Sequence, residues 1–330
     1  MPGRAEGGTK ERPLRYFVGH YIASMKRFLR KLGRRFKTAE HWLTAQVALA
    51  VLWLLRLLPP DASLNFAERA ARRIGPMTGR HRVALDNLRR AYPEKSAAEI
   101  EAIASDMWAN MARLAVEYVF LDKLFDFDPE KPNAGRVEVA GIDVFLHVRE
   151  EKRPHIFFTA HLGNFEFLPI AAATFGLQVT SLFRPPNNPY IAEYIHKTRR
   201  SSMGGLLASR SGVALQLARV LDEGGNIGVL VDQKFMGGVR TRFFGRECNT
   251  SPLVPKLARH YDCDVYPAHC IRLPDGRYRL EVSEKLDLPR DEDGAIDVPK
   301  TAQLLNDVVE EWVRADPGQW MWFHKRWQIR

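Results

Sequence analysis

Residues 155–176 read HIFFTAHLGNFEFLPIAAATFG, and this stretch decides the fold class. His155–Thr159 is a short apolar run of β-forming residues, which predicts a buried strand. Gly163–Asn164 then predicts a tight turn, and Phe165–Phe175 predicts an apolar helix that Gly176 ends. A strand, a turn and a helix in this order form the repeating unit of α/β sheets.

The following part of the chain alternates in the same way. Further strands are predicted at residues 137–139, 178–183, 226–231, 265–272 and 278–285. Helices are predicted at residues 142–149, 190–202, 213–223, 251–261 and 300–314. The last two strands are joined by an Asp-Gly turn, which predicts an antiparallel hairpin near one edge. We therefore expect an α/β fold with a central mixed sheet flanked by helices.

The domain organisation follows from shifts in composition. Three helices are predicted ahead of the α/β part, at residues 61–74, 80–91 and 97–120. An Asp/Pro/Asn/Gly-rich stretch at 124–135 predicts a linker after them. The expected order is a basic N-terminal arm (1–41), a membrane anchor helix (42–60) and one domain (61–330), which comprises a helical lead-in (61–123) and an α/β body (136–330).

The positive charge of the chain is concentrated at its N-terminus. The 330 residues carry a formal net charge of +10, and residues 1–37 hold eleven Lys/Arg against two Glu, a net charge of +9. The rest of the chain is therefore close to neutral. A nucleic-acid enzyme usually carries its basic surface on the folded domain. A basic arm ahead of an apolar stretch instead fits an anionic membrane surface, so we expect a lipid surface as partner and no nucleic acid.

The apolar stretch itself is short. Residues 42–55 read WLTAQVALAVLWLL, an uncharged run of 14 residues, whereas a full membrane span needs about 20. A buried helix of the core and a segment inserted in or on the bilayer both remain open. A simple span would keep the basic arm in the cytoplasm and carry the body outside. We therefore expect an anchor that enters the membrane without carrying the body across, and Trp42 and Trp53 suit its interfacial position.

The cysteines predict neither a disulfide framework nor a metal centre. Cys248, Cys263 and Cys270 are odd in number and have no CxxC spacing. We expect three reduced thiols in a cytoplasmic setting. Because no HExxH motif or neighbouring Cys/His pair occurs, no metal site is expected.

His161 and Glu166 are the candidate proton-transfer pair. His161 directly follows the buried strand, and the carboxyl ends of strands are where α/β sheets bind ligands. Asn164 is a candidate N-cap, which places Glu166 in the first helical turn. If the loop folds His161 back toward Glu166, the carboxylate fixes the tautomer and the other ring nitrogen can take a proton from a hydroxyl. The alternative is a capping loop in which both side chains are only structural.

A wider set of motifs resembles one known family. HLGNFE is similar to the HxxxxD/E signature of the glycerolipid and lipid A acyltransferase superfamily, and its GNFE form resembles the late, lauroyl/myristoyl-type acyltransferases of lipid A biosynthesis. Four further blocks resemble that family in the same order. They are residues 82–93 (RVALDNLRRAYP), 183–189 (FRPPNNP), 231–245 (VDQ with FFG) and 319–327 (QWMWFHKRW).

The resemblance implies an acyltransferase without a cofactor. It implies transfer of a fatty acyl group from acyl carrier protein to a hydroxyl of an acyl chain on a lipid A precursor of the Kdo-lipid IVA type. The product would be an acyloxyacyl ester in lipopolysaccharide biosynthesis. It also implies a location at the cytoplasmic face of the bacterial inner membrane. The alternatives are a lysophospholipid or glycolipid acyltransferase, a very-long-chain lipid A acyltransferase, and a non-catalytic protein that binds a membrane surface or nucleic acid through its basic arm alone.

The resemblance also assigns roles to residues. His161 would be the general base and Glu166 the group that orients it. Arg184, with backbone N–H groups around Gly163 and Asn164, would stabilise the oxyanion. Asp232 and Gln233 end a predicted strand, so they should reach the same edge and hold Arg184 or the acceptor. The candidates for acceptor phosphates and sugars are Arg199, Arg242 and Arg326.

Overall fold

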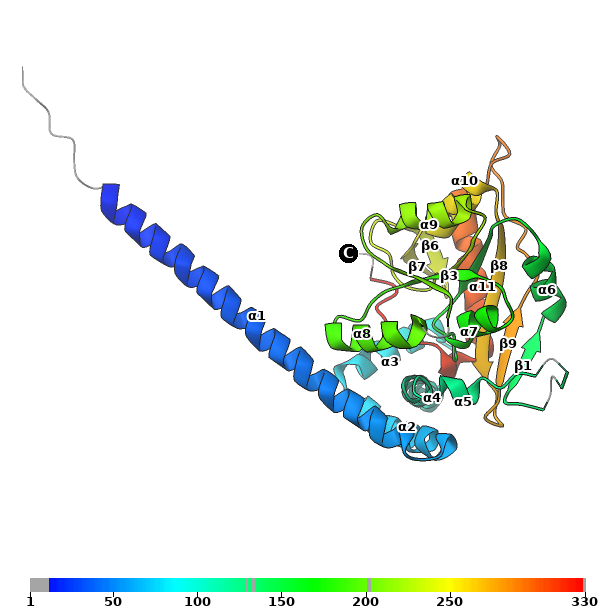
Figure 1. Ribbon diagram of the computed structural model, residues 1–330, viewed down its shortest axis with the longest axis horizontal. Coiled ribbons are helices and arrows are strands. Elements are labelled where there is room, and N and C mark those ends of the chain that lie inside the picture. The colour runs from blue at the N-terminus through cyan, green and yellow to red at the C-terminus, as the bar shows by residue number, and fades with distance from the viewer. Residues whose placement is uncertain (1–11, 129, 132–133, 201–202, 329–330) are drawn as a thin grey trace, which may run out of the picture.

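The computed structural model describes residues 12–128, 130–131, 134–200 and 203–328, so the first eleven residues of the predicted arm lie outside it. A seven-stranded sheet in the order β1-β9-β8-β2-β5-β3-β4 forms the centre (Figure 1). Its strands are β1 (Val137–Ala140), β2 (His155–Thr159), β3 (Val179–Phe183), β4 (Gly205–Ala208), β5 (Asn226–Leu230), β8 (Asp264–Arg272) and β9 (Tyr278–Val282). Only β8 and β9 pair antiparallel within it, which confirms the predicted mixed sheet and hairpin.

Helices cover both faces of the sheet. Successive residues of β2 point to opposite faces, so Ile156 and Phe158 pack with one set of helices and Phe157 with the other. The first set is α9 (Val213–Asp222), α10 (Leu253–Tyr261) and α11 (Val298–Ala315). The other face carries α6 (Ile142–Glu150), α7 (Phe167–Thr174) and α8 (Pro189–Arg200).

The predicted helical lead-in is present as separate helices. It consists of α2 (Pro60–Ile74), the 3-10 turn η1 (Gly75–Met77), α3 (Gly79–Ala91), α4 (Ala97–Glu117) and the short α5 (Leu121–Leu124). At the start of α4, the Ser96 hydroxyl accepts from the Glu99 N–H, and the Glu99 carboxylate accepts from the Ser96 N–H. This reciprocal cap was predictable from the sequence and is worth about 1 kcal/mol. Helix α4 packs against α2 and η2 (Pro317–Gln319), and so joins the lead-in to the C-terminal segment.

The first helix, α1 (Arg12–Arg56), projects from the body as a long rod (Figure 1). It is continuous across residues 41 and 42, where the sequence analysis placed the boundary between arm and anchor. It contacts the body through Asn188, whose Nδ2 donates to His41 O at 2.6 Å and to Thr44 Oγ1 at 3.1 Å. Within the described residues, no helix has an apolar stretch of the length and hydropathy that a membrane span requires.

Helix α1 joins the core along one edge only: Ala45 and Leu55 are buried, and Leu55 packs in a cluster with Leu64. Trp42 is 50% exposed and Trp53 62% exposed, so the interpretation of residues 42–55 as a helix buried in the core does not hold for most of this stretch. The exposed apolar side chains between residues 42 and 58 are Trp42, Leu43, Val47, Val51, Trp53, Leu54, Leu57 and Leu58.

A small second sheet, β6 (Val239–Phe243) with β7 (Arg246–Thr250), was missed in the sequence. Its strands read VRTRF and RECNT, and these short, mostly polar segments give no clear apolar run. Phe244 and Gly245 both have positive φ (52° and 66°), as the two central residues of a type I′ hairpin turn require. Cys248, Cys263 and Cys270 are all buried and free.

Candidate active site

The loops that follow β2 and β5 bring His161 and Asp232 together. The two strands are parallel neighbours in which Thr159 pairs with Leu230. Each side chain lies two residues beyond its paired position, so both reach the carboxyl edge of the sheet side by side. His161 Nδ1 lies 2.8 Å from Asp232 Oδ1, and the His161 backbone N–H donates to Asp232 Oδ2 at 2.9 Å.

Asp232 is held as a carboxylate in spite of its burial. It also accepts a hydrogen bond from Trp320 Nε1 at 2.8 Å. Burial would raise the pKa of Asp232, but the His161 ring and backbone N–H, with the Trp320 N–H, outweigh it and lower the pKa to about 2. A carboxylate only accepts hydrogen bonds, so His161 Nδ1 carries the hydrogen. His161 Nε2 is therefore left with a lone pair that can take a proton.

Gln233 approaches that second nitrogen. Its Nε2 lies 3.2 Å from His161 Nε2 and donates to it. The His161 side chain is 15% exposed, so the ring is nearly enclosed but reachable. Gln233 thus marks the position from which a hydroxyl group would approach the base.

Glu166 does not orient His161, and this prediction is corrected. The Glu166 carboxylate binds Arg199 of α8, whose Nε lies 3.1 Å from Glu166 Oε2 and whose Nη2 donates to Oε1. Arg199 Nε also donates to Tyr118 Oη at 2.7 Å, and its guanidinium lies over the ring of Phe183. Helix α7 begins only at Phe167, so the turn before it directs Glu166 toward α8 instead of back to His161.

Arg199 is therefore not available for acceptor phosphates. Its side chain is only 13% exposed and its N–H groups bind Glu166 and Tyr118. Burial lowers the pKa of Arg199, but the charge of Glu166, together with Tyr118 and the hydrogen bonds to both residues, outweighs burial and the net pKa is raised. The Glu166–Arg199 pair is a buried ion pair that joins α7 to α8.

Gly163 and Asn164 fix the loop that follows His161 through contacts with the interior of the protein. Gly163 has φ +53°, and a Cβ atom there would lie 2.0 Å from Cys270 O. Its N–H donates to Gln319 O at 3.1 Å, so it is not free to bind an oxyanion, and that prediction is wrong. Asn164 is fully buried: its Nδ2 donates to Glu117 Oε2 at 2.9 Å, and its Oδ1 accepts from the Glu166 N–H at 3.2 Å.

A buried ion pair supports Asn164 from beneath. Glu117 is completely buried, and its Oε1 accepts from Arg272 Nε at 2.8 Å and from Tyr278 Oη at 2.7 Å. Arg272 also donates to Asn110. The Arg272 backbone N–H and C=O both bind the Gln319 side-chain amide, at 2.8 and 2.9 Å. Helix α4, strand β8 and the C-terminal segment thus meet under the loop that carries His161.

An apolar cavity of about 290 Å³ lies between the sheet and helices α6, α7 and α8. Its size is at the lower end of the range of about 300–1,000 Å³ that is usual for ligand pockets. Phe165 lines the cavity and also contacts His161, with ring centroids 5.0 Å apart. Glu166 and Arg199 are among its few charged lining residues, so the cavity begins next to the base and runs along the sheet.

The other predicted arginines lie in three different settings. Arg184 follows β3 and is exposed, and its charge contributes to lowering the pKa of His324. Arg242 is exposed on the β6–β7 hairpin. Arg326 is 1% exposed and donates to Asn249 O, Thr250 Oγ1 and Asn306 Oδ1. Its predicted role in acceptor binding is therefore wrong, because it is a buried structural residue.

Comparison with known proteins identifies the family of this chain. Residues 30–329 match the family model described as bacterial lipid A biosynthesis acyltransferase. The chain belongs to this family. The acyltransferase is 26% identical to the lipid A biosynthesis myristoyltransferase of Escherichia coli (strain K12), over 92% of each chain. It is also 26% identical to the lauroyltransferase of that strain, over 90% of this chain and 96% of the relative. The resemblance stated from the motifs is confirmed.

His324 is a residue of the acyltransferase site to which the sequence assigned no role. Its Nε2 accepts from the Lys234 backbone N–H at 3.0 Å, which holds the loop after Asp232 and Gln233. Burial lowers the pKa of His324 to about 4, and the charges of His161, Arg326 and Arg184 act in the same direction. His324 is thus a neutral acceptor at physiological pH. The signal for it was its place in the closing QWMWFHKRW block.

The lowered pKa of His324 predicts a loss of stability in mild acid. Between its ordinary pKa of 6.5 and about 4, the unfolded chain binds a proton at this histidine and the folded chain does not. The free energy of unfolding should therefore fall as pH decreases through this window, by up to about 3 kcal/mol from this group. Denaturant unfolding at pH 7 and pH 4.5 measures it. His324→Gln keeps an acceptor without titrating, so its pH dependence should be smaller; equal dependence would contradict the assignment.

Removal of Arg272 should destabilise the acyltransferase strongly. Arg272→Met leaves Glu117 as an unpaired charge at a fully buried position, which costs about 3–5 kcal/mol. Denaturant unfolding followed by circular dichroism measures the change. Arg279→Met on the neighbouring strand is the matched control, because Arg279 is 46% exposed in its ion pair with Glu138. Equal stabilities of the two variants would refute the structural role of the pair.

Proposed function

We propose that this acyltransferase transfers a fatty acyl group from acyl carrier protein to a hydroxyl of an acyl chain on a lipid A precursor of the Kdo-lipid IVA type. The product is an acyloxyacyl ester, and no cofactor takes part. The observation that carries the proposal is an apolar cavity that begins beside a histidine held by a buried carboxylate. A fatty chain needs the cavity, and a hydroxyl nucleophile needs the base.

In the proposed reaction, His161 Nε2 takes the proton of the acceptor hydroxyl. The hydroxyl oxygen forms a bond to the thioester carbonyl carbon, the carbon–sulfur bond breaks, and the carrier thiol takes up the proton. Asp232 stabilises the imidazolium that forms, as a carboxylate does in a catalytic triad. Gln233 is the nearest side-chain donor to Nε2, and Arg184 is exposed at the end of β3, so these two supply hydrogen bonds to the oxyanion and the headgroup.

The Glu166–Arg199 pair has a different part in the proposal. Both residues line the cavity, and the pair joins α7, which follows the His161 loop, to α8. In the proposal it closes the cavity wall next to the base and keeps the acyl carbonyl near His161. Because both charges are buried and paired, replacement of either residue alone leaves an uncompensated charge in that wall.

Helix α1 supplies the proposed membrane attachment. Its exposed apolar side chains around Trp42 and Trp53 would enter the headgroup region, while the basic residues before them bind anionic lipids. The proposed location is the cytoplasmic face of the bacterial inner membrane, where acyl carrier protein is accessible. Asn188 couples this helix to α8, and hence to the cavity wall.

The reaction is tested by incubating the full-length protein with acyl carrier proteins that carry chains of different length and with Kdo-lipid IVA in mixed micelles. Mass spectrometry should show the mass of one added acyl group on the lipid A precursor. Acylation of a lysophospholipid, without any added acyl mass on the precursor, would refute the proposed acceptor. Equal yields from acyl coenzyme A and acyl carrier protein would refute the proposed donor.

A substitution in the cavity should change the preferred chain length. Ala172 lines the cavity and is 8% exposed, so Ala172→Phe fills part of the space that an acyl chain would occupy. We expect the ratio of long-chain to short-chain transfer to fall at least tenfold, while the variant keeps transfer of the shorter chains. Competition between two acyl carrier proteins in one reaction measures this ratio. An unchanged ratio would show that the chain binds elsewhere.

A further inference from the structure

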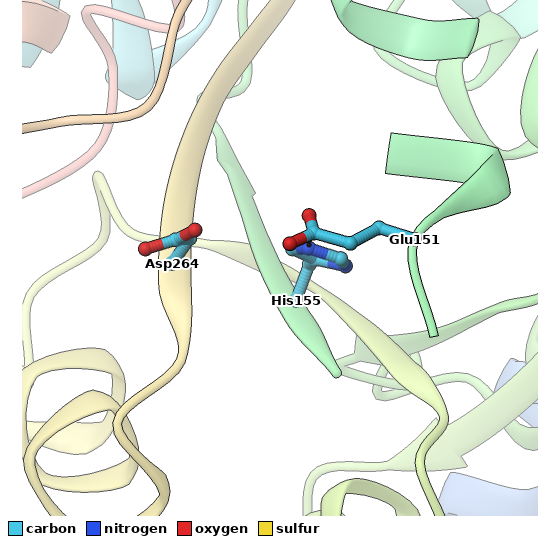
Figure 2. A group of neighbouring side chains, drawn as sticks. All are labelled: Glu151, His155 and Asp264. Atoms are coloured by element: carbon cyan, nitrogen blue, oxygen red, sulfur yellow. Dashed lines mark hydrogen bonds and ion pairs between the residues drawn. The ribbon is translucent and has the colours of Figure 1, made fainter. Parts of the chain in front are cut away.

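Three side chains converge at the amino end of β2, opposite to His161. Glu151 follows the last residue of α6, His155 is the first residue of β2, and Asp264 is the first residue of β8 (Figure 2). His155 and Asp264 are paired in the parallel ladder between β2 and β8. One ligand atom from each of the three side chains lies within 4.8 Å of the other two.

The hydrogen on the His155 ring can be placed from its surroundings. His155 is completely buried, and its backbone N–H donates to Asn226 Oδ1 at 2.9 Å. Asn226 Nδ2 donates to Gln178 O at 3.2 Å, so the orientation of this amide is set at both ends. His155 Nδ1 lies 3.2 Å from the same Asn226 oxygen. Because that oxygen only accepts, Nδ1 carries a hydrogen.

The other ring nitrogen therefore needs a cation. His155 Nε2 lies 2.8 Å from Glu151 Oε2, and Figure 2 shows the ring and the carboxylate facing each other. With the hydrogen on Nδ1, two lone pairs would meet here unless a proton or a metal ion lies between them. A proton satisfies these two groups alone, whereas a metal ion also uses Asp264. The hydrogen bond from Nδ1 to an oxygen acceptor is the arrangement that usually orients a metal-binding histidine.

The basic residues around the cluster do not prevent a metal ion from binding there. Arg153 Nη2 lies 3.5 Å from Asp264 Oδ1, and Lys285 Nζ lies 3.1 Å from Asp264 Oδ2. Their side chains are 40% and 56% exposed. Exposed ion pairs of this kind contribute only about 0–1 kcal/mol, so a divalent ion can displace them at little cost. Glu151 and Asp264 are themselves partly exposed, which leaves the cluster open to ions from solution.

We propose that Glu151, His155 and Asp264 bind a divalent transition-metal ion of the Zn²⁺ class. One imidazole and two carboxylates suit such an ion, and three protein ligands leave a fourth position for water. No metal site was expected from the sequence, which has no HExxH motif, and Asp264 lies more than 100 residues after the other two ligands in the chain. The five residues of β2 separate His155 from His161 by roughly 20 Å, so the ion takes no part in the reaction at His161.

The proposed ion would act on the cavity wall. It would tie the residue after α6 to the first residues of two central strands, and α6 lines the cavity with Ile142, Phe145 and Leu146. A bound ion should therefore fix α6 against the sheet and raise the melting temperature of the protein.

Metal binding is tested on the untagged full-length protein in detergent, after treatment with a chelator. Titration with Co²⁺ should show one equivalent with visible d–d absorption that Zn²⁺ displaces, and Zn²⁺ should raise the melting temperature. Asp264→Asn and Glu151→Gln should each weaken binding at least tenfold. Glu150→Gln and Asp262→Asn are the matched controls, because these neighbouring carboxylates are 75% and 85% exposed, and they should bind as the wild type does.

Three outcomes would overturn the proposal. The first is a wild-type protein that binds no Co²⁺ equivalent, and the second is a His155 ring that keeps both N–H groups in nitrogen NMR spectra with excess Zn²⁺. The third is retention of full binding by Asp264→Asn. The same titration on His161→Ala separates this site from the pair of His161 and Asp232, because the proposed site should be unchanged in that variant.

Discussion

Replacement of His161 by alanine should lower the rate of acyl transfer by about 10²–10⁴-fold, the usual contribution of a general base. The variant lacks the imidazole that is proposed to take the proton of the acceptor hydroxyl. The fold should persist, because Asp232 keeps the hydrogen bonds from the backbone N–H of residue 161 and from Trp320 Nε1. Initial rates with the acyl carrier protein and lipid A precursor, at matched protein concentration, measure the effect.

The control for this experiment is a histidine that has no part in the proposed active site. His260 is exposed near the end of α10, and His260→Ala should transfer acyl groups at the wild-type rate. Circular dichroism and liposome flotation should find His161→Ala folded and membrane-bound. If His161→Ala keeps more than a tenth of the wild-type rate, His161 is not the base, even though the family assignment stands.

Asp232→Asn should have an effect of similar size, about 10²–10⁴-fold on the rate, for a reason specific to this structure. Three N–H groups point at the Asp232 carboxylate: the His161 backbone, His161 Nδ1 and Trp320 Nε1. An asparagine has one oxygen and one NH₂ group. Its NH₂ group must therefore either face an N–H donor or force His161 into its other tautomer. In the second case the hydrogen moves to Nε2 and the base is lost.

Glu166→Gln is the discriminating comparison for Asp232→Asn. If Asp232 orients His161, as the 2.8 Å hydrogen bond indicates, Asp232→Asn should shift the pH dependence of kcat/KM that the histidine sets. Glu166→Gln should lower the rate through the cavity wall and leave that pH profile in place, because Glu166 binds Arg199. A shifted profile in Glu166→Gln and an unshifted one in Asp232→Asn would restore the carboxylate of the HLGNFE motif as the partner of His161.

The positions of His161 and Asp232 were within reach of the sequence. Both directly follow strands that are predicted from the sequence, at residues 155–159 and 226–231, and both were expected at one edge of the sheet. Their pairing was not within reach, because it depends on β2 and β5 being neighbours in the strand order. The motif spacing favoured Glu166, since it lies only five residues from His161. That spacing does not predict the direction in which the Glu166 side chain points from the turn before α7.

The arginines show the same limit. Arg184, Arg199, Arg242 and Arg326 are equivalent as sequence letters, and each was a candidate for anionic groups. Burial separates them: Arg326 and Arg199 satisfy acceptors of the protein, whereas Arg184 and Arg242 remain exposed. Burial is a property of the neighbours that the fold supplies, so local sequence does not predict it.

Sequence patterns alone predict the α/β class, the strand that leads into His161, the separation of the basic arm from a neutral body, and the family through its ordered motifs. These features depend on local periodicity, on turn residues and on charge along the chain, all of which can be read in order. Three contacts come from the tertiary structure: Asp232 with His161, Glu166 with Arg199, and Asp264 with Glu151 and His155. The first and the third depend on which strands are neighbours and in what register, and the second depends on how α7 packs against α8. Another strand order, register or helix packing would separate these side chains while leaving every local pattern intact.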